Sequence, residues 1–336
     1  MSKGDIMDTL FFALNAILPI ILLIALGYQL KRINMFNRGF LKVANSFVFR
    51  VALPVLLFVN VYKIESIKDI DWAVVLYSVL MIIIVFILGI ICVLVFVPDD
   101  RRKGVVVQAT FRSNYAIIGI PLATALGGVE ATAIASILSA FSIPLFNVLA
   151  VIGLSVFIKE EGKPVSYVGI LKNIAKNPLI IGVMFGLFAL VIRNYTTAFS
   201  LKEDIPFLFK AISDVAVIAS PLALIILGAD FEFKAIKSMY KEILLGVTWK
   251  IVLTPILSLS VGYLLFKQFE VINISADTLP GLIALFGSPV AVTSAVMAAE
   301  MGSDEELAAQ LVVWSSIGSV ITIFLFVVFF KNIGLL

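Results

Sequence analysis

The sequence has no histidine, one cysteine and few charged residues. Without histidine the chain has no imidazole metal ligand, no histidine general base and no histidine pH switch. With Cys92 as its single cysteine it has no disulfide within the chain. The 25 lysines and arginines form no single basic stripe, so we expect no nucleic-acid partner. We therefore predict no catalytic residues, no metal site and no cofactor.

The sequence is instead rich in hydrophobic residues, which form long apolar runs. Hydrophobic residues make up 61% of the 336 residues and charged residues 14%, against roughly 45–50% and 25% in soluble domains. A helix that crosses a bilayer needs about 20 apolar residues. Ten runs of roughly this length occur, at residues 8–30, 40–62, 72–97, 105–127, 131–158, 178–193, 206–228, 242–266, 279–300 and 306–330. The pattern predicts an all-α polytopic membrane protein with ten transmembrane helices.

Two segments outside the regular pattern have their own interpretation. The first run follows a single lysine and has no small-residue cleavage signature after it, so we take it as a helix and not as a removed signal peptide. The linker at residues 159–177 has helical apolar spacing with lysines on its polar side, which indicates an interfacial amphipathic helix.

The basic residues indicate how the chain sits in the bilayer. The odd-numbered loops hold 14 of the 25 lysines and arginines, whereas the even-numbered loops and the two ends hold 8. Basic loops stay on the cytoplasmic side of a membrane. We therefore expect cytoplasmic odd-numbered loops, both termini extracytoplasmic, and a location in the cell membrane.

Ten helices divide into two sets of five, and an odd number of helices per set inverts the second set. Two pairs of similar words support this division. VALPVLLFVN and IASPLALIIL align Pro54 with Pro221, and ALGGVEATAIASIL and AEMGSDEELAAQLV align Gly128 with Gly302. We therefore predict a five-helix repeat in residues 1–158 and a second, inverted repeat in residues 178–336. Chance similarity between apolar helices is the alternative explanation.

Two of the ten predicted helices are interrupted by polar and helix-breaking residues. In FRSNYAIIGIPLATALGG we expect the break at the Gly-Ile-Pro word, because Gly119 lacks a side chain and Pro121 lacks an N–H group, and Asn114 before it offers a donor and an acceptor. In the ninth helix the break falls around Ser288 and Pro289. A helix that restarts after a break points its positive end at whatever binds there. The pair of breaks predicts an anion site, and a proline kink that only permits close packing is the alternative.

These words resemble the auxin efflux carrier family, which includes plant auxin exporters and bacterial carriers for malonate, malate and similar carboxylates. The matching words are NYAIIGIPLA, GGVEA, NPLIIG, PLALIILGADF and WKIVLTPILSLSVG, and the similarity covers nearly the whole chain. The resemblance implies that helices 4 and 9 cross at their unwound middles. It also implies a mobile transport domain of helices 3–5 and 8–10, and a scaffold of helices 1, 2, 6 and 7 that forms a homodimer.

The resemblance further implies a set of substrate-binding residues. We expect Asn114 and the crossover backbone to hold the substrate carboxylate, and Ser142 and Asn147 fall where plant members present substrate-facing polar side chains. Ser294 stands where those members have a crossing proline, although Pro289 keeps a break in the helix. The linker after the fifth helix is short, so a bulky aromatic substrate does not follow from the resemblance.

Ionisable side chains within the apolar runs are functional candidates by default. Arg112 could attract an anion, or it could reach toward the cytoplasmic face. Lys250 could take part in coupling, extend to the membrane surface or form a structural pair. Asp214 is the best single carboxylate for proton or cation coupling, and a surface pair with Lys210 is the alternative. Tyr115 could flank the substrate or pack as an ordinary tyrosine.

These observations predict a secondary active transporter of a small organic anion that works by alternating access at the crossing of helices 4 and 9. A sodium-coupled symporter or a cation/proton antiporter of related fold is the alternative within transport. A non-transporting anion sensor is the alternative outside transport, and an enzyme is disfavoured. The expected partners are the substrate anion and the lipid bilayer, with proton or sodium coupling left open.

Overall fold

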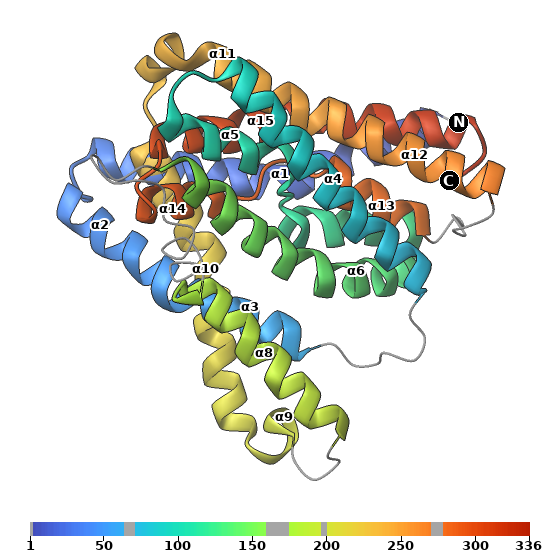
Figure 1. Ribbon diagram of the computed structural model, residues 1–336, viewed down its shortest axis with the longest axis horizontal. Helices are drawn as coiled ribbons and strands as arrows, with labels where there is room; N and C mark the ends of the chain where they lie inside the picture. The colour runs from blue at the N-terminus through green and yellow to red at the C-terminus, as the bar shows by residue number, and fades with distance from the viewer. Residues whose placement is uncertain (1–2, 64–70, 159–174, 196–199, 270–277) are drawn as a thin grey trace.

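The computed structural model describes residues 3–63, 71–158, 175–195, 200–269 and 278–336, which form helices joined by short connections (Figure 1). The main helices are α1 (Lys3–Arg32), α2 (Arg38–Phe47), α3 (Leu53–Tyr62), α4 (Trp72–Phe96), α5 (Asp100–Phe111), α6 (Ile120–Phe157), α8 (Pro178–Tyr195), α9 (Leu201–Asp204), α10 (Pro206–Asp230), α11 (Ile236–Thr248), α12 (Thr254–Phe269), α13 (Thr278–Gly287), α14 (Thr293–Glu300) and α15 (Glu305–Asn332). The predicted all-α class is confirmed. Most of the predicted amphipathic linker lies outside the described residues.

Helices occupy all ten predicted apolar runs. Six segments are long and apolar enough to cross a membrane, namely Arg38–Tyr62, Trp72–Phe96, Tyr115–Phe157, Pro206–Asp230, Ile236–Leu265 and Glu305–Asn332. Tyr115–Phe157 covers two predicted runs, which meet at a kink where Gly128 has a φ of 68°. Glycine tolerates this backbone conformation because it has no Cβ atom. The number of membrane crossings, the orientation and the inverted repeat stay predictions.

Three π-helical turns widen the helices, and each ends two residues before a proline. They are η1 (Val48–Ala52) before Pro54, η2 (Tyr115–Gly119) before Pro121 and η4 (Trp249–Leu253) before Pro255. In an α-helix the proline ring collides with the carbonyl group of residue i−4. In all three cases that carbonyl belongs to the middle residue of the π-turn, where the wider turn relieves the collision. The helices therefore continue through these prolines.

The helices pack in two groups. In the first group α8 packs on α3, α3 on α10 and α10 on α1, and Figure 1 shows α3, α8 and the first half of α10 projecting beyond the rest of the molecule. α4, α5, α6 and α11 to α15 form the other group, in which α6 packs on α13 and α5. The resemblance assigns the first group to a scaffold and the second to a transport domain. Movement of one group against the other stays a prediction.

Glycines let the helices of the first group approach closely. A Cβ atom on Gly27 of α1 would lie 1.9 Å from the carbonyl oxygen of Ile225 in α10, and one on Gly228 would lie 1.9 Å from that of Ile24. Within lipid, apolar side chains gain little by leaving one apolar surrounding for another, so close backbone packing becomes a main source of helix attraction. These two glycines therefore allow the backbones of α1 and α10 to pack in direct contact.

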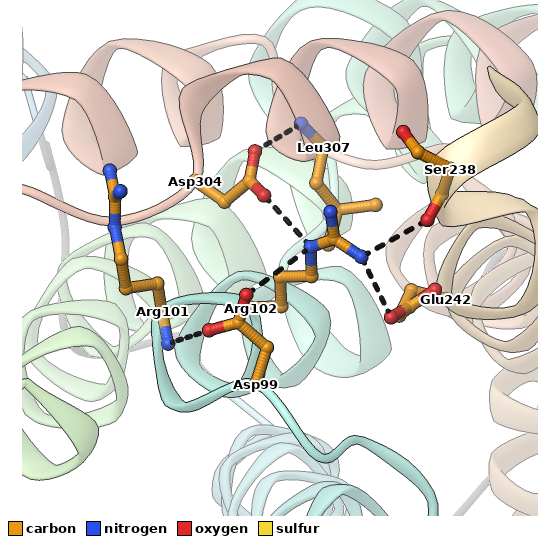
Figure 2. A network of polar contacts seen from close by, with 7 residues as sticks. All are labelled: Asp99, Arg101, Arg102, Ser238, Glu242, Asp304 and Leu307. Atoms are coloured by element: carbon orange, nitrogen blue, oxygen red, sulfur yellow. Dashed lines mark hydrogen bonds and ion pairs between the residues drawn. The ribbon is translucent and has the colours of Figure 1, made fainter. Parts of the chain in front are cut away.

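One arginine ties three helices of the second group together at their ends (Figure 2). The Nε atom of Arg102 in α5 donates to Asp304 Oδ2 at 2.9 Å. Its Nη1 atom donates to Glu242 Oε1 in α11 at 3.1 Å and to the Ser238 carbonyl at 3.3 Å. Asp304 is also the N-cap of α15. The three charged side chains are only 11–19% exposed, so water and salt screen them less than they screen an open surface pair.

We predict that Arg102→Ala lowers the free energy of unfolding by about 1–3 kcal/mol, because two partly buried carboxylates lose their donor. Arg101→Ala is the matched control, since Arg101 is exposed and Figure 2 shows its guanidinium group apart from the network. Thermal unfolding of the purified variants measures the difference. Equal melting temperatures for the two variants would contradict the prediction.

Candidate functional site

The first helix interruption lies earlier than the sequence suggested. α5 ends at Phe111, and the three residues that follow leave helical geometry. We expected the break at Gly119 and Pro121, but both lie in the resumed helix because the π-turn before Pro121 accommodates its ring. The second interruption lies where predicted, between the end of α13 at Gly287 and the start of α14 at Thr293.

The two interruptions meet and pair with each other. Ser113 forms an antiparallel β-bridge with Val290. Main-chain hydrogen bonds flank the bridge, from Asn114 N to Pro289 O at 2.8 Å and from Ala291 N to Arg112 O at 3.2 Å. A broken helix frees N–H and C=O groups that an apolar interior cannot satisfy. Each break therefore supplies partners for the other.

The extended backbone sends neighbouring side chains to opposite sides of the crossing. Side chains alternate along an extended segment. Arg112 and Asn114 line a cavity of about 60 Å³, and Ser113 between them also borders it. The Ser113 hydroxyl group instead donates to the Leu285 carbonyl and accepts a hydrogen bond from Lys250 Nζ at 2.6 Å. The crossing therefore has an Arg112 side and a Lys250 side.

The cavity lies between the two groups of helices. Leu53, Leu57 and Asn60 of α3 line it from the first group, together with Ser220 of α10. From the second group, the lining includes residues at the starts of the two resumed helices, which are Tyr115, Ala116 and Ile117 after the first break and Thr293 after the second. The first N–H groups of a helix have no partner within that helix, and its dipole is positive there. Two positive helix ends therefore meet at this cavity.

Arg112 is buried at the cavity and contacts neutral groups. Its Nη2 atom donates to Asn147 Oδ1 and to Thr293 Oγ1, both at 2.7 Å. Its Nη1 atom donates to Gln108 Oε1 at 2.9 Å and contacts Met297 Sδ at 2.8 Å. No carboxylate pairs with it among the described residues, although its exposure is only 2%. The Arg112 side chain is therefore held inside the protein, and its charge has no counter-ion within the described part of the chain.

The amide group of Asn114 is the second notable feature of the cavity. Asn114 is buried, and within the described residues its Nδ2 atom has no hydrogen-bond partner. A buried donor without a partner costs about 1–3 kcal/mol, so native proteins rarely keep one without a reason. An acceptor that enters the cavity would satisfy it.

Two further predicted residues support these groups. Asn147 lines the cavity and holds Arg112, and its own Nδ2 atom donates to the Ile143 carbonyl at 2.7 Å. Tyr115 also lines the cavity, but its hydroxyl group donates to the Gly281 carbonyl at 3.3 Å. A Cβ atom at Gly119 would lie 2.2 Å from the Tyr115 ring, so Gly119 makes room for this tyrosine.

The three predicted serines do not line the cavity. Ser142 is buried on α6, and Ser288 donates to the Ala284 carbonyl at 2.6 Å within its own helix. Ser294 touches the site through Arg112, whose Nη1 atom lies 3.4 Å from its Oγ atom. Pro289 contributes the carbonyl group that pairs with Asn114. These residues shape the crossing and do not face the cavity.

Lys250 lies on the other side of the crossing and is fully buried. Its Nζ atom donates to the Ser113 hydroxyl group at 2.6 Å and to the Phe286 carbonyl at 3.3 Å. The alternative that it extends to the membrane surface is therefore wrong.

Asp214 lies away from the crossing. It is 59% exposed and pairs with Lys210, whose Nζ atom lies 2.6 Å from Asp214 Oδ2. The surface pair that the sequence left open is the observed arrangement. We therefore propose no coupling role for Asp214.

A larger hollow, which we call the vestibule, lies at the far end of α14. It has a volume of about 590 Å³ and is lined by Lys31, Arg38, Lys42, Asp230, Glu232, Glu300, Glu305 and Glu306, among others. These residues come from α1, α2 and α10 on one side and from α14 and α15 on the other. α14 runs from Thr293 at the cavity to Glu300 at the vestibule, about 10 Å at 1.5 Å per residue.

Sequence reasoning missed several lining residues. Thr293, Asn60 and Ser220 are single polar residues in apolar helices, and no motif marks them. Thr293 follows the second break as Tyr115 follows the first, so the paired breaks could have indicated it. The vestibule was missed because its residues come from helix ends far apart in the sequence.

Six segments long and apolar enough to cross a membrane, together with two interrupted helices that pair beside the buried Arg112, are what a multi-pass membrane protein would have. The family model described as Membrane transport protein matches residues 12–327, and the chain belongs to this auxin efflux carrier-like family. An uncharacterized transporter of Methanocaldococcus jannaschii is 24% identical over 303 residues, which are 89% of this chain and 91% of the relative. An uncharacterized transporter of Methanothermobacter thermautotrophicus is 24% identical over 322 residues, which are 92% and 95%.

We predict that Asp214→Asn leaves the pH and sodium dependence of transport unchanged and lowers the free energy of unfolding by less than about 0.5 kcal/mol, because exposed i,i+4 pairs contribute little. Flux in proteoliposomes under imposed gradients and thermal unfolding measure the two effects. Lys210→Met is the matched control, since it removes the same pair from the other side. A changed gradient dependence in Asp214→Asn alone would restore this residue as a coupling group.

Proposed function

We propose that this protein is a secondary active transporter that carries a small organic anion by alternating access at the crossing of the two interrupted helices. One observation carries the proposal. The guanidinium group of Arg112 is buried beside a cavity, without a carboxylate partner among the described residues, and the unpartnered amide of Asn114 lines the same cavity. A carboxylate would supply both the missing charge and the missing acceptor.

The electrostatics of the cavity favour an anion over a neutral solute. An isolated buried charge is costly unless it is paired. The guanidinium group stays charged at any physiological pH, so it attracts a carboxylate even while its Nη1 and Nη2 atoms donate to neutral side chains. The positive ends of the helices that resume at Tyr115 and Thr293 add to the attraction, each by about 0.3–1 kcal/mol or more where water is excluded.

Alternating access is supported by the placement of the hollows. The cavity and the vestibule both lie between the first and second groups of helices, so a shift between the groups would change access to the cavity. The Glu300 side chain of α14 lies 3.3 Å from Asn45 Nδ2 and 3.6 Å from Arg50 Nε across this boundary. Such contacts hold the groups together in one arrangement and would separate in another.

An inverted pair of five-helix repeats is part of the same proposal. The two interruptions occupy corresponding places in the two halves of the chain. The glycines that the sequence aligns, Gly128 and Gly302, both have positive φ, at 68° and 73°. Inverted repeats with broken helices at their interface are the usual construction of secondary transporters. A homodimer through the first group of helices stays a prediction from the resemblance.

The alternative functions have less support. A symporter or antiporter built on a buried acid needs a carboxylate near the crossing, and no acid is among the residues that line the described cavity. A sensor would use the same anion pocket and differs only in binding the anion without moving it. Transport is favoured over sensing because the family model covers residues 12–327 and the relatives are named as transporters.

We predict that Asn114→Ala weakens binding of the transported acid by about 10- to 100-fold, since a hydrogen bond to a charged group contributes about 1.5–3 kcal/mol. Arg112→Gln should weaken it by about 100-fold or more, because the anion loses its counter-charge. Binding of radiolabelled mono- and dicarboxylates to the purified protein, followed by their flux in proteoliposomes, measures both effects.

Arg193→Gln is the control for this prediction, since Arg193 lies at the end of α8 and donates to the Tyr62 carbonyl away from the crossing. It should leave binding unchanged. Unchanged affinity in folded Asn114→Ala and Arg112→Gln would remove the crossing as the substrate site. Binding without flux in the parent protein would favour the sensor.

A further inference from the structure

Lys250 lies where two helices end. α13 ends at Gly287 and α5 ends at Phe111, and both ends point at the crossing. The last four carbonyl groups of a helix have no partner within that helix, and the helix dipole is negative there. The Lys250 ammonium group has an exposure of 0% and donates to the Phe286 carbonyl at 3.3 Å.

Several oxygen atoms converge around this ammonium group. The Ser113 hydroxyl group accepts from Lys250 Nζ at 2.6 Å and itself donates to the Leu285 carbonyl. One turn along the same helix, the Thr254 hydroxyl group donates to the Thr110 carbonyl at 2.7 Å, near the end of α5. Lys250 Nζ therefore contacts one hydroxyl and one carbonyl oxygen, Ser113 Oγ and Phe286 O, beside the ends of α13 and α5.

Such surroundings suit a hard cation. Sodium and similar ions bind carbonyl, hydroxyl and carboxylate oxygens, and in transporters with interrupted helices the unwound carbonyls and the helix C-terminal ends coordinate the coupling ion. We propose that the ammonium group of Lys250 is a built-in cation that takes the place of a coupling sodium ion at the crossing, so that the carrier binds its anion without sodium.

This arrangement gives the two buried cationic side chains of the crossing, Arg112 and Lys250, different roles. Lys250 offsets the negative ends of α5 and α13, which leaves the charge of Arg112 available to a ligand on the other side of the paired segment. The alternation of side chains at Arg112 and Ser113 keeps the two cations on opposite sides. A neutral side chain of similar length, such as methionine, would fill the space of Lys250 but would not offset the partial negative charge at the two helix ends.

The proposal has two parts. The claim that Lys250 occupies a cation position is independent of the transported substrate. The claim that binding and flux need no sodium rests on the proposed carrier function. The first part is tested on the purified full-length protein without substrate, so its failure is distinguishable from failure of the carrier proposal.

The experiment is a comparison of melting temperatures in sodium chloride and in choline chloride at equal concentration, for the parent protein and for Lys250→Ala. Choline is too large for the vacated position. We expect no difference between the salts for the parent. We expect Lys250→Ala to melt at a lower temperature than the parent and to recover by about 2–4 °C in sodium chloride, because an ion that binds only the folded state stabilises it.

Two controls accompany this comparison. Lys241→Ala removes an exposed lysine of α11 and should respond equally to the two salts. Lys250→Met fills the position without charge, and should melt at a lower temperature than the parent without recovery in sodium chloride. Should Lys250→Ala fail to fold in both salts, Lys250→Gln is measured in its place, with the same recovery in sodium chloride expected.

Two results overturn the first part. One is stabilisation of the parent protein by sodium over choline. The other is equal melting of the folded Lys250→Ala or Lys250→Gln variant in the two salts. Flux of the parent that is equal in sodium and choline supports the second part, and flux that stops in choline overturns it.

Discussion

The structure depends on how two broken helices satisfy their free backbone groups within an apolar protein. α5 and α13 both stop in the interior, and each would leave N–H and C=O groups without partners. Backbone groups at the two breaks satisfy one another, because the residues after each helix pair as a short antiparallel bridge between Ser113 and Val290. Either break alone would leave buried backbone groups without partners, which costs free energy. The helix that resumes after the first break, α6, also packs against α13.

The chemistry of the site follows from that short extended segment. Because side chains alternate along it, one break presents Arg112 and Asn114 to the cavity and Ser113 to Lys250. In a helix, consecutive side chains are distributed around the axis, so Arg112 and Ser113 would not point to opposite sides. The same breaks turn two helix starts toward the cavity and two helix ends toward Lys250. The positive end of each dipole then favours an anion on one side of the crossing, and the negative end favours a cation on the other.

Apolar length and spacing were enough to predict the helical segments, because a run of about 20 apolar residues has few other structures open to it. Asn114, Tyr115 and Asn147, which the polar interruption and the family resemblance predicted as substrate-binding residues, line the cavity, and their role in binding stays a prediction. The position of the first break was wrong, because a proline indicates strain and does not show whether a break or a π-turn relieves it. The partners of Arg112 and Lys250 include residues far away in the chain. The sequence could therefore identify these two residues as candidates, but it could not show whether each side chain is buried at the crossing or extends to the surface. The role of Asp214 was left open for a different reason, because the sequence shows Lys210 four residues earlier but does not show that this part of α10 is exposed, as the structure does.

The central claim is that the crossing holds the anion. The most direct test is a density map of the full-length protein with the transported acid bound, at a resolution that shows side chains. We predict density for the carboxylate within hydrogen-bonding distance of the Arg112 guanidinium group and of Asn114 Nδ2. Density for the acid among Lys31, Arg38 and Lys42 of the vestibule, with the crossing cavity unchanged, would contradict the claim.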